Sequence, residues 1–217
     1  QQDNMTYSEL KSLIQDYLQN TETSFVSNIN NVIKQAEERI LKTVKLPVFR
    51  KNVSGNLSSG SEYLATPTDF LDNFSLSITN SSEQSFLLFK DVNFIREAYP
   101  NASTTGIPKH YALFDDSTFI VGPTPNAAFT VELHYFYRPA SITAGADSGT
   151  TWLSTNARNA LLYASLIEGY MYMKGDMDLM NQYEKRYMES ISRLKTLGEG
   201  DNTVDTYRDD VVRVQRT

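Results

Sequence analysis

The stretch IPKHYALFDDSTFIVGPTPNAAFTVELHYFYRPA, residues 107–140, decides how the rest of the chain is interpreted. Its β-branched and aromatic runs are separated by Asp-Asp-Ser and by Gly-Pro-Thr-Pro-Asn. Such clusters of turn-forming residues between apolar runs indicate short strands. The pattern predicts strands at 109–114, 118–121 and 128–138. We expect these three strands to form an antiparallel meander at the centre of a β region.

The third of these strands alternates between two kinds of side chain. Successive residues of a strand point to opposite faces, so the alternation predicts one core face and one mixed face. The core set is Phe129, Val131, Leu133, Tyr135 and Tyr137, and the mixed set is Thr130, Glu132, His134, Phe136 and Arg138.

The first part of the chain has helical periodicity instead. Thr6 and Glu9 have the spacing of a capping box, which predicts the start of a helix. A second helix is predicted after a polar break at 20–24, and it should end before Pro47. Its apolar stripe is Phe25, Ile29, Val32, Ile33, Ala36 and Ile40.

Between these helices and the stretch 107–140, short apolar runs alternate with turn-forming residues. This spacing is typical of a small antiparallel sheet or barrel. Asp91 is expected to cap a short helix over 91–99. The expected strands lie at 48–53, 63–65, 70–79 and 86–89, with a Gly/Ser/Asn turn at 54–61.

After the stretch 107–140 the chain returns to helices. Small polar residues at 141–151 predict an exposed linker, and Ser154 is a good N-cap for the next helix. Residues 157–173 are apolar on nearly all sides, which predicts a buried helix. The glycines at 198 and 200 are expected to end one more helix. Its apolar stripe is Met180, Tyr183, Tyr187, Ile191 and Leu194.

The helices at the two ends of the chain each need a partner for their apolar faces, and the simplest solution packs them together. This predicts an α+β protein in which a helical bundle, residues 1–46 and 152–198, carries an inserted antiparallel β region at 47–151. Residues 199–217 are expected to form an extended C-terminal tail.

The tail cannot bury a core, yet it carries scattered apolar anchors that a solvated tail lacks. We expect it to order on a partner, for instance by adding a strand to a neighbour's edge. The alternative is a frayed terminus. The residues expected to make the contact are Val204, Tyr207, Arg208, Val211, Val212 and Arg213.

The composition excludes several function classes. The net charge is −6, whereas proteins that grip nucleic acid through their surface are usually basic. The chain has no cysteine, which excludes disulfides, thiolate zinc sites and cysteine catalysis. No apolar run reaches the length of a membrane span, so no membrane partner is expected.

Catalytic patterns are nearly absent. Asp115 and Asp116 are adjacent in a turn and should point apart, and aspartates favour turns for local hydrogen bonding. His110 and His134 lie on facing β segments, but two ligands do not make a metal site. There is no phosphate-binding loop and no nucleophile elbow. The sequence therefore predicts neither an enzyme nor a cofactor.

Six segments carry a resemblance to a known family. They are LPVFR at 46–50, YLATPTDF at 63–70, GIPKHYA at 106–112, IVGPTP at 120–125, YFYRP at 135–139, and WL at 152–153 before the helix at 160–173. Their order and spacing resemble the head-to-tail adaptor (connector) proteins of tailed bacteriophages, the group that includes tail tubular protein A of short-tailed phages. The resemblance spans roughly residues 5–208.

The resemblance implies a structural virion protein, assembled in the host cytoplasm and placed at the head–tail junction. Such adaptors form a ring, usually of twelve copies, between the portal protein and the tail nozzle or tube, and the ring continues the DNA channel used in genome ejection. DNA would pass without sequence-specific binding, along an acidic wall that repels phosphate.

The same resemblance assigns partners to parts of this chain. The six anchors of the tail would contact the portal. Two turns of the β region would contact the tail component, through Asp115, Asp116, Ser117, Pro123, Pro125 and Asn126. The alternative is a β-rich receptor- or carbohydrate-binding tail module that uses exposed tyrosines and the Asp115–Asp116 turn.

Overall fold

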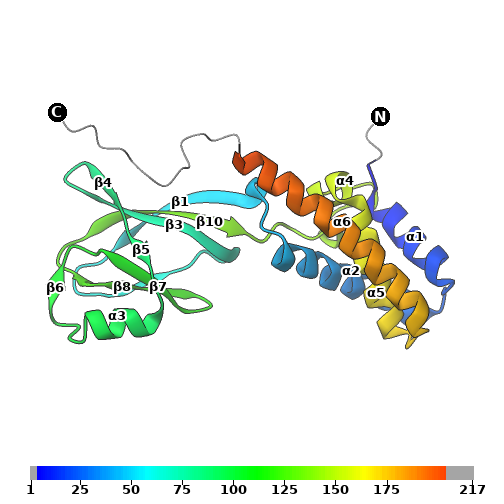
Figure 1. The fold of residues 1–217 in the computed structure, drawn as a ribbon, viewed down its shortest axis with the longest axis horizontal. Coiled ribbons are helices and arrows are strands. Elements are labelled where there is room, and N and C mark those ends of the chain that lie inside the picture. The colour runs from blue at the N-terminus through cyan, green and yellow to red at the C-terminus, as the bar shows by residue number, and fades with distance from the viewer. Residues whose placement is uncertain (1–3, 204–217) are drawn as a thin grey trace. The chain divides into compact units, whose positions relative to one another are not determined.

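The computed structural model describes residues 4–203, except for the side chains of 199–203 (Figure 1). The chain forms two compact units. We call the first the helical unit; it comprises the chain up to Pro47 and from Ala140 onward. The second, Val48–Pro139, is called the β unit. Helices and antiparallel sheets are both present, which confirms the predicted α+β class.

The helical unit begins with α1 (Tyr7–Leu18) and α2 (Thr23–Thr43). The predicted capping box is confirmed: the Thr6 side chain accepts from the Glu9 N–H, and the Glu9 carboxylate accepts from the Thr6 N–H. The predicted stripe of α2 is also buried. Both helices pack against α5 (Arg158–Tyr172), whose buried positions are mostly apolar.

The helix α5 is preceded by a short helix, α4 (Trp152–Asn156), that begins earlier than expected. Thr151 is its N-cap, and Ser154 occupies the third helical position. The prediction that Ser154 is an N-cap is therefore wrong. The Ser154 hydroxyl oxygen accepts from the Thr151 N–H, so this serine completes a capping box begun by the threonine.

The last helix, α6 (Met177–Thr203), packs along α5 with its predicted stripe buried at Tyr183, Tyr187, Ile191 and Leu194. The prediction that Gly198 and Gly200 end it is wrong, because the helix runs through both. A glycine in a helix costs only about 1 kcal/mol relative to alanine, and packing offsets that amount. Gly198 is buried, and a Cβ there would lie 3.4 Å from Leu46 Cδ2.

The linker predicted after the β unit is largely exposed, as expected, but one residue of it is anchored in the helical unit. Residues Ile142–Ala144 form a 3-10 turn, and Ile142 is buried. The carboxylate of the buried Glu37 accepts from the Ile142 N–H at 2.9 Å. Burial raises the pKa of Glu37 above its usual value. The small polar residues of this segment therefore conceal one apolar anchor.

The first sheet of the β unit has the order β1-β10-β3-β4, and every neighbouring pair is antiparallel. The predicted turn at 54–61 is shorter than expected: β1 continues through Leu57, and the chain turns only at 58–61, where the Ser61 N–H donates to the Ser58 carbonyl. Ser81 and Ser82, both at positive φ, join β3 to β4. The bounds are β1 Arg50–Leu57, after a 3-10 turn at Pro47–Phe49, β3 Phe70–Asn80, β4 Glu83–Phe86 and β10 Phe129–Tyr137.

The second sheet has the order β2-β8-β7-β5, and a third pair joins β6 to β9. The predicted hairpin of β7 and β8 is confirmed, but β10 belongs to the other sheet, so the three-stranded meander is wrong. Two short pairs, β5 with β7 and β6 with β9, are parallel. The bounds are β2 Tyr63–Ala65, β5 Leu88–Phe89, β6 Thr105–Gly106, β7 His110–Asp115, β8 Thr118–Gly122 and β9 Thr124–Pro125.

The two sheets enclose the main core of the β unit between their inner faces. The core set predicted for β10 is confirmed at Phe129, Val131, Leu133 and Tyr135, which pack with Tyr111, Phe119 and Val121 of the second sheet. Helix α3 (Val92–Ala98), capped by Asp91 as predicted, covers the other face of that sheet through Ile95. Both faces of β7 and β8 are therefore occupied.

Candidate functional site

The six residues expected to contact the portal, Val204 to Arg213, lie outside the described part of the chain. The structure describes helix α6 through Thr203, the residue immediately before them.

The turn at Asp115–Ser117 joins β7 to β8 and lies on the surface. The Asp115 carboxylate accepts hydrogen bonds from the Ser117 backbone N–H at 2.9 Å and from the Ser117 hydroxyl at 3.1 Å. The backbone hydrogen bond is the main reason why the pKa of Asp115 is lowered. Asp116 is exposed and has no hydrogen bond or ion pair among the described residues. One carboxylate thus shapes the turn and the next faces solvent.

The second expected contact turn, Pro123 to Asn126, is mostly not at the surface. Thr124 and Pro125 are buried in β9, and the Pro125 carbonyl accepts from the Gly60 N–H at 2.8 Å. Asn126 is exposed, while its N–H donates to the Gly106 carbonyl. Only the Asn126 end of this turn offers a fully exposed side chain to a partner.

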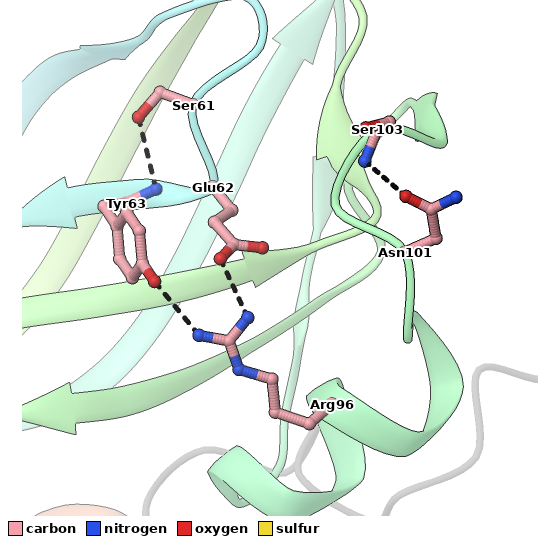
Figure 2. Close-up of polar contacts among 6 residues, drawn as sticks. All are labelled: Ser61, Glu62, Tyr63, Arg96, Asn101 and Ser103. Carbon is pink, nitrogen blue, oxygen red and sulfur yellow. Dashed lines mark hydrogen bonds and ion pairs between the residues drawn. The ribbon is translucent and has the colours of Figure 1, made fainter.

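A polar cluster beside the first turn was not anticipated from the sequence. Figure 2 shows the Arg96 guanidinium, on α3, donating to the Glu62 carboxylate at 2.9 Å and to the Tyr63 hydroxyl at 3.0 Å. These two groups raise the pKa of Arg96, the tyrosine hydroxyl first. The Tyr63 ring also packs edge-to-face on Phe114, with 5.3 Å between centroids. The cluster holds α3 against β2 and the start of the acidic turn.

This cluster contributes order more than stability. The Arg96 side chain is about half exposed, at 45%. An exposed ion pair typically adds only about 0.2 to 1 kcal/mol to the free energy of unfolding. Its residues come from segments far apart in the sequence, so no local spacing could have indicated it. The same view shows the Asn101 side chain accepting from the Ser103 N–H, which orders the loop after α3 (Figure 2).

The two histidines lie on different sheets and have different neighbours. His110, on β7, is hydrogen-bonded through Nδ1 to the Tyr99 hydroxyl at 2.7 Å and packs against Phe94. Burial, and then the charges of Lys90 and Lys109, lower the pKa of His110. His134, on β10, contacts Phe74 instead. No group of three metal-binding side chains exists among the described residues.

The most exposed apolar residues of the β unit lie where β4 gives way to β5. Phe86 is 65% exposed, Leu88 61% and Phe89 50%, whereas Leu87 between them is buried. The sequence run 86–89 was expected to be one strand, and its apolar character did not reveal which side chains would face solvent. Large exposed apolar patches in soluble domains usually mark sites of interaction.

A concave surface of the helical unit lies at the start of α5. It has a volume of about 480 Å³ and is open to solvent. Its lining includes Asn156, Asn159, Ser190, Arg193 and Leu197. The mixed lining and wide opening do not resemble the enclosed, mostly apolar pockets that bind small ligands.

The described residues present exposed turns and patches on a two-unit α+β scaffold, as a protein that works through contacts with other proteins would. No helix among them is long and apolar enough to cross a membrane.

The sequence matches the SU10 adaptor protein family over residues 5–214, nearly the whole chain. The chain therefore belongs to that family, and it is a structural adaptor protein of a bacteriophage. Adaptors of this kind are virion components that interact with other phage head and tail proteins. No curated protein matches the chain significantly.

Proposed function

We propose that this adaptor forms a ring that joins the portal protein to the tail nozzle or tube and continues the DNA channel. The family match over residues 5–214 carries the proposal, because the match covers both units and reaches into the C-terminal segment. The ring would contain about twelve copies, as in the connectors that the sequence resembles, tail tubular protein A among them. The net charge of −6 suits a channel wall that lets DNA slide without binding it.

Within this proposal the C-terminal residues Val204 to Arg213 contact the portal. The supporting feature is the position of the segment directly after Thr203, the last residue of α6 that the structure describes. The exposed Asn126 end of the second turn is proposed to contact the tail component. The Asp115–Ser117 turn is not assigned to the tail component. Its charge and the exposed rings beside it fit a contact with a neighbouring copy of this chain better.

The test is reconstitution of the full chain with its portal, measured by native mass spectrometry. A closed oligomer, alone or only after portal is added, supports the proposal. A matched pair of variants, one ending at Thr203 and one full-length, separates portal binding from folding. If the variant ending at Thr203 binds portal as tightly as the full chain, the proposed portal contact is wrong. A trimer would instead favour a receptor-binding tail module.

A further inference from the structure

The β unit carries two exposed surfaces of opposite charge, one near each end of strand β7. We call the first the basic edge; it comprises Phe86, Leu88, Phe89, Lys90, Phe94 and Lys109. We call the second the acidic tip; it comprises Tyr63, Phe114, Asp115 and Asp116. All ten residues are exposed.

The basic edge lies where both sheets of the unit end. Strand β4 is the last strand of one sheet and β5 is the last strand of the other, so no further strand covers either among the described residues. Leu88 donates its N–H to the Lys109 carbonyl at 2.9 Å, which places the two residues side by side. An uncovered sheet edge with exposed apolar side chains is a surface that soluble proteins normally protect.

Two lysines give this edge its charge. Lys109 directly precedes His110, and the Lys90 N–H donates to the carbonyl of Tyr111, the residue after His110, at 2.8 Å. Neither lysine forms an ion pair within the described residues, although Lys90 lies over the Phe94 ring at 5.1 Å. The nearest carboxylate in sequence, Asp91, accepts from the Phe94 N–H as a helix cap. The lysine charges are therefore available to a partner.

The acidic tip stands at the far end of β7. Strand β7 runs from His110 to Asp115, so the tip and the edge are separated by about 17 Å at roughly 3.4 Å per residue. The tip also has an apolar component, the edge-to-face pair of Tyr63 and Phe114. Glu62 and Arg96 nearby neutralise each other, which leaves the turn carboxylates as the dominant charge.

A contact between two different surfaces of one chain repeats from copy to copy. Such head-to-tail contacts generate a closed ring when the rotation from each copy to the next adds up to a full turn. Opposite charges favour the correct encounter, and the apolar side chains on both surfaces supply area to bury.

We propose that the acidic tip of one copy docks on the basic edge of the next copy. This inference rests on the proposed ring, and it identifies which surfaces of the β unit join the subunits. The occupant of the apolar edge is thus a second copy of this chain.

The absence of cysteine from the chain allows a clean cross-linking test. The full chain carrying both Asp116→Cys and Lys109→Cys is oxidised and separated without reductant. Neighbouring copies would then form a ladder of covalent oligomers, because each copy carries both halves of the contact. Each single cysteine variant should form no covalent oligomers. The matched control pairs Lys109→Cys with Glu97→Cys, an exposed position on α3, and should give no ladder.

Charge reversal provides a second readout that does not depend on disulfide geometry. Asp116→Lys or Lys109→Glu alone should weaken self-association about tenfold, and the two together should restore much of it, because rim charges steer association. Sedimentation velocity measures the effect. The isolated control Glu97→Lys should change association little.

The outcomes separate this inference from the ring itself. A closed oligomer by native mass without a 109–116 ladder overturns the inference and leaves the ring proposal standing. Covalent dimers from a single cysteine variant overturn it as well, since they indicate a two-fold contact. Failure to form any oligomer or ladder, even with portal present, contradicts both.

Discussion

The packing of Tyr99 over Gly122 gives a sharp prediction about the β unit. A Cβ on Gly122 would lie 2.6 Å from Tyr99 Cε2, and closer still to Cδ2. Carbon atoms pack no closer than about 3.5 Å, so the ring would have to move by roughly 1 Å. The ring is not free to do so, because its hydroxyl is hydrogen-bonded to His110 Nδ1 at 2.7 Å. Gly122→Ala should therefore strain the contact of α3 with the second sheet.

The expected cost follows from two opposing effects. Overpacking of this kind typically costs about 1 to 3 kcal/mol. Replacing a strand glycine by alanine returns about 0.5 to 1 kcal/mol of backbone entropy. We expect a net loss of about 1 to 2 kcal/mol in the free energy of unfolding, which corresponds to several degrees in Tm for a domain of this size. Urea unfolding followed by far-UV circular dichroism measures it.

Two controls test whether the ring is the cause. Gly55→Ala places a Cβ 3.6 Å from Val131 Cγ2, an ordinary contact, and should leave stability unchanged or slightly higher. In a Tyr99→Leu background the ring is gone, so Gly122→Ala should then cost little. The reasoning is refuted if Gly122→Ala costs the same with and without Tyr99, or if it costs nothing in the native chain.

Three further predictions concern single side chains. Burial raises the pKa of Glu37, so folding binds protons there and its contribution falls as pH rises above 4.5; Glu37→Gln should become stabilising relative to the native chain between pH 4 and 7, and an unchanged difference by urea titration contradicts this. Asp91→Ala removes the cap of α3 and should lower the free energy of unfolding by about 1 kcal/mol, measured by the same unfolding curves. Asp91→Asn should keep most of that stability, because asparagine also caps helices well. Burial, together with the hydrogen bond to Asp69, raises the pKa of Tyr135 to about 12. The folded state therefore holds that proton while the unfolded chain loses it, so the stability contributed here should decline between about pH 10 and 12, and Tyr135→Phe should lessen that decline.

Sequence signals of short range were the reliable ones. The capping box at Thr6 and Glu9, the cap at Asp91 and the alternation of β10 depend on neighbours within a few residues. The structure confirms each of them. Ser154 shows the limit even here, since two hydroxyl residues three positions apart can both act at one helix start, and the earlier one is the cap.

Pairing between distant strands was not recoverable in the same way. The three strands predicted within residues 107–140 are all present, as β7, β8 and β10. Strand β10, however, lies between β1 and β3, which come well before it in the sequence. The chain leaves the second sheet at Gly122 and passes through β9, which pairs with β6. Alternation indicates which face of a strand is buried; it does not indicate which strand lies beside it. The meander was therefore wrong although all three strands were present.

The exposed surfaces were the least predictable feature. An apolar run such as 86–89 indicates a strand, and only the sheet order shows that no further strand of the described residues covers it. Arg96 gave no signal because its partners, Glu62 and Tyr63, lie on another part of the chain. The interaction surfaces of this adaptor thus depend on tertiary placement more than on any motif.

The course of α6 also changes how the C-terminal segment can be tested. The glycines suggested that the tail begins at residue 199, but the helix continues through Thr203. A deletion after Gly200 would remove helical residues along with the tail, so a loss of portal binding would be ambiguous. Gly198 packs close to Leu46, which places the end of this helix against the chain segment before the β unit. Truncation directly after Thr203 preserves that packing, and only then does lost binding report on Val204 to Arg213 themselves.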